Sequence, residues 1–96
     1  ALSPKDNDAN IRLSVKAYPN PATDYVNITI KTETPKNMSL RLYDIFGVQV
    51  VTPVEIIGST TENTIQINVS KLRRGVYIYT LSADNRILFT DKIVKK

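Results

Sequence analysis

Apolar and polar residues alternate along most of the chain, in short segments separated by residues that favour turns. Val26, Ile28 and Ile30 alternate with Asn27 and Thr29, so the two sets would lie on opposite faces of an extended strand. The same pattern predicts seven strands: Leu13–Ala17, Tyr25–Lys31, Ser39–Tyr43, Val48–Thr52, Thr64–Val69, Gly75–Ser82 and Ile87–Val94. We therefore expect an all-β chain folded as a seven-stranded antiparallel β-sandwich, with an open barrel as the alternative.

Two of the expected turns follow from residues that tolerate a positive φ. Gly47 would close a short hairpin within Tyr43–Val48, because glycine has no Cβ to oppose that conformation. Asp84 and Asn85 would form a two-residue hairpin turn, since both residues accept the left-handed region. Both turns would join strands that are adjacent in the sequence.

A helical turn and a stiff corner are expected elsewhere. Ser70 can cap a single turn over Lys71–Arg74, which Gly75 would end.

The segment Pro19-Asn20-Pro21 cannot continue a strand ladder, because each proline ring fixes φ and removes a hydrogen-bond donor. We expect this corner to be architectural, with Thr23 or Asp24 satisfying free amides in the turn.

Residues 1–12 are polar, and we interpret them as a linker from an upstream cargo domain to a sandwich over residues 13–96. Asp6, Asp8 and Asn10 have the spacing of the first ligands of a calcium loop. However, Ile11 and Ala17 stand where such a loop requires glycine and glutamate. We therefore expect no metal site.

The composition excludes most catalytic chemistry. The chain has no cysteine, histidine or tryptophan, so thiolate sites and histidine-dependent triads are impossible. Its glycines, Gly47, Gly58 and Gly75, are too far apart for a phosphate-binding loop. No run approaches the roughly 20 apolar residues that a membrane helix needs. We expect no enzymatic activity and no cofactor.

Positive charge is concentrated in the last quarter of the chain. Residues 1–70 hold six Lys or Arg against seven acids, whereas residues 71–96 hold seven against two. A regular hairpin at Asp84-Asn85 would place Tyr77 opposite Lys92, Arg74 opposite Lys95 and Arg73 opposite Lys96.

Arg73, Arg74, Lys95 and Lys96 would then form a cationic patch for an anion or an acidic partner. The other interpretation of this patch is a frayed end whose charges repel each other. We expect no nucleic-acid binding, because Tyr77 and Tyr79 lie on a strand that is apolar on both faces.

Several short motifs follow one another from Ala17 to Lys96. They are Tyr18-Pro19-Asn20-Pro21, Val26-Asn27-Ile28, Leu42-Tyr43-Asp44 with Gly47, Leu72-Arg73-Arg74-Gly75-Val76-Tyr77 and Lys92-Ile93-Val94-Lys95-Lys96. In this order and spacing they resemble the type A C-terminal sorting domain of the type IX, or Por, secretion system.

The resemblance implies an immunoglobulin-like sandwich that acts as a non-catalytic signal. It directs an exported cargo protein through the periplasm to the outer membrane, the cell surface or the medium of Bacteroidota. The implied partners are an outer-membrane shuttle or translocon protein and a sortase-like cysteine protease that cuts in the preceding linker. In that family the released cargo is joined to an anionic lipopolysaccharide.

By position, the resemblance also assigns the residues tied to sorting and those of its other motifs. The sorting residues would be Gly75, Tyr77, Lys92, Ile93, Val94, Lys95 and Lys96. Pro19, Asn20, Pro21 and Gly47 would belong to structural motifs.

Other functions remain compatible with the sequence. An adhesive or carbohydrate-binding sandwich would use Tyr18, Tyr25 and Tyr43 as its aromatic surface. A structural cap on a catalytic domain is a further alternative. Edge strands of the sandwich could also pair two copies into a homodimer.

Overall fold

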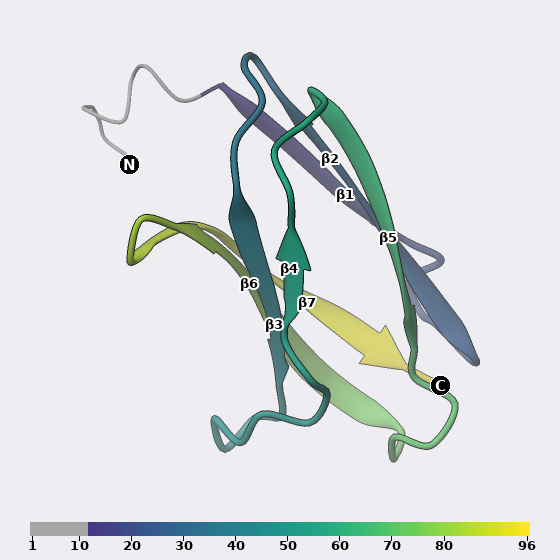
Figure 1. Ribbon diagram of the computed structural model, residues 1–96. Coiled ribbons are helices and arrows are strands. Elements are labelled where there is room, and N and C mark those ends of the chain that lie inside the picture. Colours follow the sequence, from purple (N-terminus) through teal and green to yellow (C-terminus); the bar gives the residue numbers. More distant parts are fainter. Residues whose placement is uncertain (1–11) are drawn as a thin grey trace.

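The computed structural model describes residues 12–96, which form seven strands in two sheets (Figure 1). The strands are β1 (Leu13–Tyr18), β2 (Tyr25–Thr32), β3 (Met38–Tyr43), β4 (Val54–Ile56), β5 (Glu62–Asn68), β6 (Gly75–Ala83) and β7 (Arg86–Lys95). One sheet has the order β1-β2-β5 and the other β4-β3-β6-β7, and all neighbouring strands are antiparallel. The predicted sandwich is therefore confirmed.

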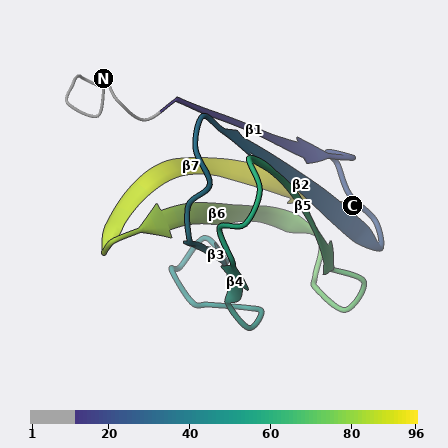
Figure 2. The same cartoon turned by 45° about the horizontal axis from the view of Figure 1, so that its top comes forward.

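The core lies between the two sheets, which face each other in Figure 2. Val26, Ile28 and Ile30 of β2 are fully buried and belong to the same core cluster as Leu40 of β3 and Leu81 of β6. The intervening residues of these strands face outward, as the period-two pattern requires. No polar or charged residue is buried within residues 12–96, so apolar packing dominates the interior.

The strand expected at Val48–Thr52 is wrong. The Asp44 carboxylate accepts hydrogen bonds from the amides of Phe46 and Val48, which folds this segment into a loop. Pairing with β3 is limited to a bridge between Tyr43 and Gln49 and one hydrogen bond from Val50, before β4 resumes it at Val54. A local side-chain turn thus replaces a strand that the valines alone would favour.

The helical turn expected over Lys71–Arg74 is also wrong. Asn68, not Ser70, supplies the organising side chain, because its Oδ1 accepts hydrogen bonds from both the amide and the hydroxyl of Ser70. One hydrogen bond from the Leu72 amide to the Val69 carbonyl completes a simple turn. The positive φ values expected at Gly47, Asp84 and Asn85 are confirmed.

The β6–β7 hairpin begins as predicted and then shifts by one residue. Ala83 faces Arg86, but a bulge next to Leu81 and Ser82 leaves Leu88 as an extra residue on β7. Tyr77 consequently faces Ile93 instead of Lys92, and Lys95 faces Gly75 instead of Arg74. The shift places an isoleucine, not a lysine, beside the core.

The corner at Pro19-Asn20-Pro21 leads the chain from β1 past the end of β7, which belongs to the other sheet, before β2 begins beside β1. The peptide bonds before Pro19 and Pro21 are cis. Ala22 then forms a parallel bridge with Lys95, which links the two sheets along one flank. The proposed linker and the calcium-like motif fall mostly or wholly on residues 1–11, outside the described residues.

Candidate functional site

The start of β6 and the end of β7 bring together the residues that the sequence tied to sorting. Gly75 is paired with Lys95, and Tyr77 is paired with Ile93. β7 is the edge strand of its sheet, so one side of its backbone points away from β6 (Figure 1). Residues of the Leu72–Tyr77 motif and of the Lys92–Lys96 motif thus lie at one corner of the sandwich.

Tyr77 and Ile93 are internal members of this group. Their side chains are only 8% and 2% exposed. The Tyr77 hydroxyl donates a 2.6 Å hydrogen bond to the carbonyl oxygen of Arg73. Tyr77 therefore holds the loop that carries Arg73 and Arg74, while its ring contributes to the core.

Gly75 has a structural requirement of its own. Its φ of +148° is one that residues with a side chain rarely adopt. A Cβ placed there would meet no atom within 4 Å, so the constraint is conformational and not steric. Gly75 lets the chain turn out of the Arg73–Arg74 loop into β6.

Within residues 12–96, no acidic side chain forms an ion pair with the cations at this corner. We call Arg73, Arg74, Lys92, Lys95 and Lys96 the basic end. All are exposed except Lys95, which is half-buried and whose Nζ lies 3.2 Å from the carbonyl oxygen of Lys96.

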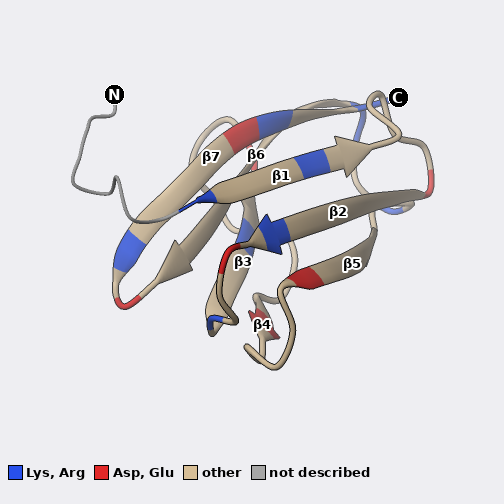
Figure 3. Ribbon diagram, turned by 90° about the horizontal axis from the view of Figure 1, so that it is seen from above, with Lys and Arg blue, Asp and Glu red and all other residues tan. Residues whose placement is uncertain are grey.

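Neither ion pair found between residues 12 and 96, Arg12–Glu33 or Lys36–Asp84, includes a cation of the basic end. Blue segments gather where β7 ends in Figure 3. The basic end is therefore available to an anionic partner.

Asp91 is the nearest acid on β7, and its carboxylate is used locally. Its Oδ1 accepts a 2.8 Å hydrogen bond from the amide of Lys92. Asp91 is also paired with Tyr79 of β6. Burial, and secondly the charge of Asp91, raises the pKa of Tyr79 to about 12.

The structure adds Asn20 to this corner, which sequence reasoning assigned only to an architectural motif. The Asn20 Oδ1 accepts a 2.9 Å hydrogen bond from the amide of Val94, and its Nδ2 donates to the carbonyl of Lys92 at 3.3 Å. Asp24 acts instead through its backbone carbonyl, which accepts a hydrogen bond from the amide of Val69 and not from an amide of the proline corner. The sequence did offer a signal for this role: Asn20 has a side chain that can donate and accept hydrogen bonds, and it stands between two prolines, which have no backbone donor.

Gly47 lies apart from the basic end, in the loop after β3. With a φ of +84°, it closes the turn in which its amide donates to the Asp44 carbonyl. Ile45 and Phe46 of this loop are largely exposed. Gly47 thus acts in the architecture of this loop.

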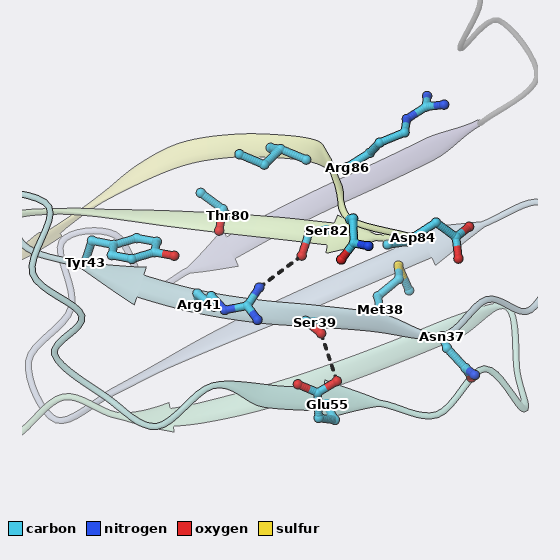
Figure 4. A pocket seen from close by; sticks show the side chains of 13 residues that line it. Asn37, Met38, Ser39, Arg41, Tyr43, Glu55, Thr80, Ser82, Asp84 and Arg86 are labelled. Carbon is cyan, nitrogen blue, oxygen red and sulfur yellow. Dashed lines mark hydrogen bonds between the residues drawn. The ribbon is translucent and has the colours of Figure 1, made fainter.

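A polar hollow lies on the outer face of β3 and β6 (Figure 4). Its side chains bond to one another, Ser39 to Glu55 at 2.8 Å and Arg41 to Ser82 at 3.2 Å. Between residues 12 and 96, no three acidic side chains are grouped as a metal site would require.

The tyrosines proposed for sugar binding are divided between the two sheets. Tyr18 and Tyr25 are each 47% exposed on β1 and β2, whereas Tyr43 is half-buried on β3. They do not form one aromatic surface. In the part of the chain that the structure describes, no helix has the length and apolarity to cross a membrane.

Comparisons with known proteins identify one family and two similar proteins. The profile of the secretion system C-terminal sorting domain family matches residues 16–96. An endo-acting ulvan lyase of Formosa agariphila is 30% identical over 92 residues, which are 95% of this chain and 16% of the lyase. The chain thus spans about a sixth of the length of that relative.

The fold also matches a solved structure. Dimeric latent PorU from Porphyromonas gingivalis aligns with a TM-score of 0.68 and 21% identity, over 94% of this chain and 10% of PorU. Proteins with such a sorting domain are exported to the outer membrane, the cell surface or the medium in Bacteroidota. From its motifs, its fold and the match over residues 16–96, this chain belongs to the secretion system C-terminal sorting domain family and is a sorting signal of the type IX system.

Proposed function

We propose that the type IX machinery recognises this chain at its basic end, through an outer-membrane shuttle or translocon protein with an acidic surface. The single observation that carries this proposal is a set of cations that have no ion-pair partner among residues 12–96, namely Arg73, Arg74, Lys92, Lys95 and Lys96. Charge complementarity of this kind steers a partner and fixes its orientation.

The sorting residues have distinct roles in this proposal. Lys92, Lys95 and Lys96 supply the charge that the partner meets, and Val94 is half-buried between them on β7. Gly75, Tyr77 and Ile93 are positioning residues, because they fix the loop and the strand that carry the cations. The chain itself performs no catalysis.

We further propose that residues 1–12 are a linker between an upstream cargo domain and the sandwich of residues 13–96. A sortase-like cysteine protease would cut in this linker and join the cargo to an anionic lipopolysaccharide. Family membership supports both steps. In the ulvan lyase the matching region is a small part of a longer enzyme, which is compatible with a separate cargo.

A localisation assay in a bacterium with an active type IX system tests the proposal. A reporter with an export leader and residues 1–96 is compared with the same protein ending at Asp91, and surface and periplasmic fractions are scored. We expect surface delivery by the first and retention of the second in the periplasm. Equal delivery by both proteins would show that Lys92–Lys96 are not the recognised residues.

A further inference from the structure

Near the end of β7, the backbone N–H and C=O groups that face away from β6 are hydrogen-bonded to other parts of the chain. Residues 92, 94 and 96 point their backbone groups away from β6, because residues 93 and 95 alternate with them. The amide of Lys92 donates to the Asp91 carboxylate, and its carbonyl accepts from Asn20 Nδ2. This first outward residue is thus satisfied on both sides.

The remaining outward groups are satisfied by the same short segment. The Val94 amide donates to Asn20 Oδ1, and the Val94 carbonyl accepts from the Ala22 amide at 2.8 Å. The Lys96 amide donates to the Ala22 carbonyl, also at 2.8 Å. From the amide of Lys92 to the amide of Lys96, every outward-facing backbone group has a partner within the chain.

An edge strand normally offers such groups to another strand. Along the part of β7 that carries Lys92, Lys95 and Lys96, these backbone groups are already hydrogen-bonded within the chain and cannot pair with another strand. The side chains of Lys92 and Lys96 stay exposed beside the occupied backbone. A partner can therefore contact the lysine side chains at this end without forming hydrogen bonds to the backbone of β7.

We propose that residues 19–22 form a latch over β7, so that an acidic protein surface recognises this end by its lysine side chains and not by adding a strand. The second half of this inference rests on the function proposed above. The latch itself does not, because it is a property of the folded chain. Strand addition, and pairing of two copies along this edge, would both require the latch to open.

Amide hydrogen exchange on the 96-residue chain tests the latch alone. Asn20→Ala removes the acceptor of the Val94 amide, and we expect that amide to exchange about five- to tenfold faster. Asn20→Asp keeps the acceptor and should preserve the protection. The Ile28 amide of the central strand β2 reports global unfolding, and its rate is used to separate local from global opening.

Asn37→Ala is the matched control. Asn37 is also an exposed asparagine whose Oδ1 accepts a backbone amide hydrogen, from Gly58 at 2.6 Å, but it lies by the first residues of β7 and away from the end that carries Val94. We expect no change at Val94 in this variant. An unprotected Val94 amide in the unaltered chain, or faster exchange in Asn20→Asp equal to that in Asn20→Ala, would overturn the latch.

Surface delivery of reporters with these variants tests how the end is recognised. We expect Asn20→Ala to lower delivery severalfold and Asn37→Ala to leave it unchanged. Undiminished delivery by Asn20→Ala, with Val94 shown to be unprotected, would show that recognition does not need the latch, and increased delivery would indicate recognition of an open edge; either result would overturn this inference. Failure of the unaltered reporter would contradict the proposed function, while the exchange rates would still decide the latch.

Discussion

The hydroxyl of Tyr77 connects a core residue to the loop of the basic end. Tyr77→Phe keeps the ring in the core and removes the hydrogen bond to the Arg73 carbonyl. We expect a loss of about 1 kcal/mol in the free energy of unfolding, measured by urea denaturation. Tyr25→Phe, at an exposed tyrosine with no hydroxyl partner among the described contacts, is the control. Equal losses in the two variants would contradict a specific role for Tyr77.

Tyr79 makes the stability of the sandwich depend on alkaline pH. Its pKa is raised from 10.0 to about 12, so the folded state retains the proton where the unfolded state has lost it. The stabilisation is complete below pH 10 and decreases as the pH rises towards 12. We expect the free energy of unfolding to fall more steeply over this range in the unaltered chain than in Tyr79→Phe. Parallel curves would show that Tyr79 does not titrate differently in the two states.

Some residues with local roles could be predicted from the sequence, whereas the local turns made by Asp44 and Asn68, and residues with distant partners, could not. Gly47, Asp84 and Asn85 adopt the expected positive φ, because the turn chemistry involves only their neighbours. Asn20 bonds to residues 72 and 74 positions away. Nothing in its local pattern identifies those partners. The cation cluster was visible as composition, but its lack of ion pairs required the structure.

The first residue of β6 decides how that strand begins. Gly75→Ala adds no steric conflict, yet it forces alanine into a φ of +148°. We expect a loss of about 1–3 kcal/mol in the free energy of unfolding from backbone strain. Val76→Ala, at the exposed neighbouring position, should cost less than about 1 kcal/mol. A Gly75→Ala variant as stable as the unaltered chain would show that the loop adopts another φ without cost.

Six of the seven strands could be predicted because alternation is a property of each strand by itself. The seventh was misplaced where the Asp44 carboxylate takes two backbone amides and turns the chain away from β3. The register of β7 was also displaced, because alternation within one strand does not reveal a bulge against its neighbour. That bulge is what places Ile93 inward beside Tyr77.

At the scale of the molecule, the longest dimension is 37 Å. Screening over about 8 Å at physiological ionic strength keeps the field of the basic end local. We expect Lys92→Gln with Lys96→Gln to reduce surface delivery severalfold while the free energy of unfolding changes by less than about 0.5 kcal/mol. The matched double variant, Lys16→Gln with Lys31→Gln on the other sheet, should be delivered normally. Equal delivery by both double variants would contradict recognition through charge.

The latch joins residues 19–22, near one end of the chain, to the last five residues at the other. The recognition surface that we propose is therefore discontinuous in the sequence, and its two parts meet only after β1 and β7 have reached their places in different sheets. A chain with a damaged first strand would still contain every terminal lysine, but it would not hold them in this form. This surface therefore forms only in the folded domain. Secretion machinery that recognises it in this form would select proteins whose C-terminal domain has folded, as well as transport them.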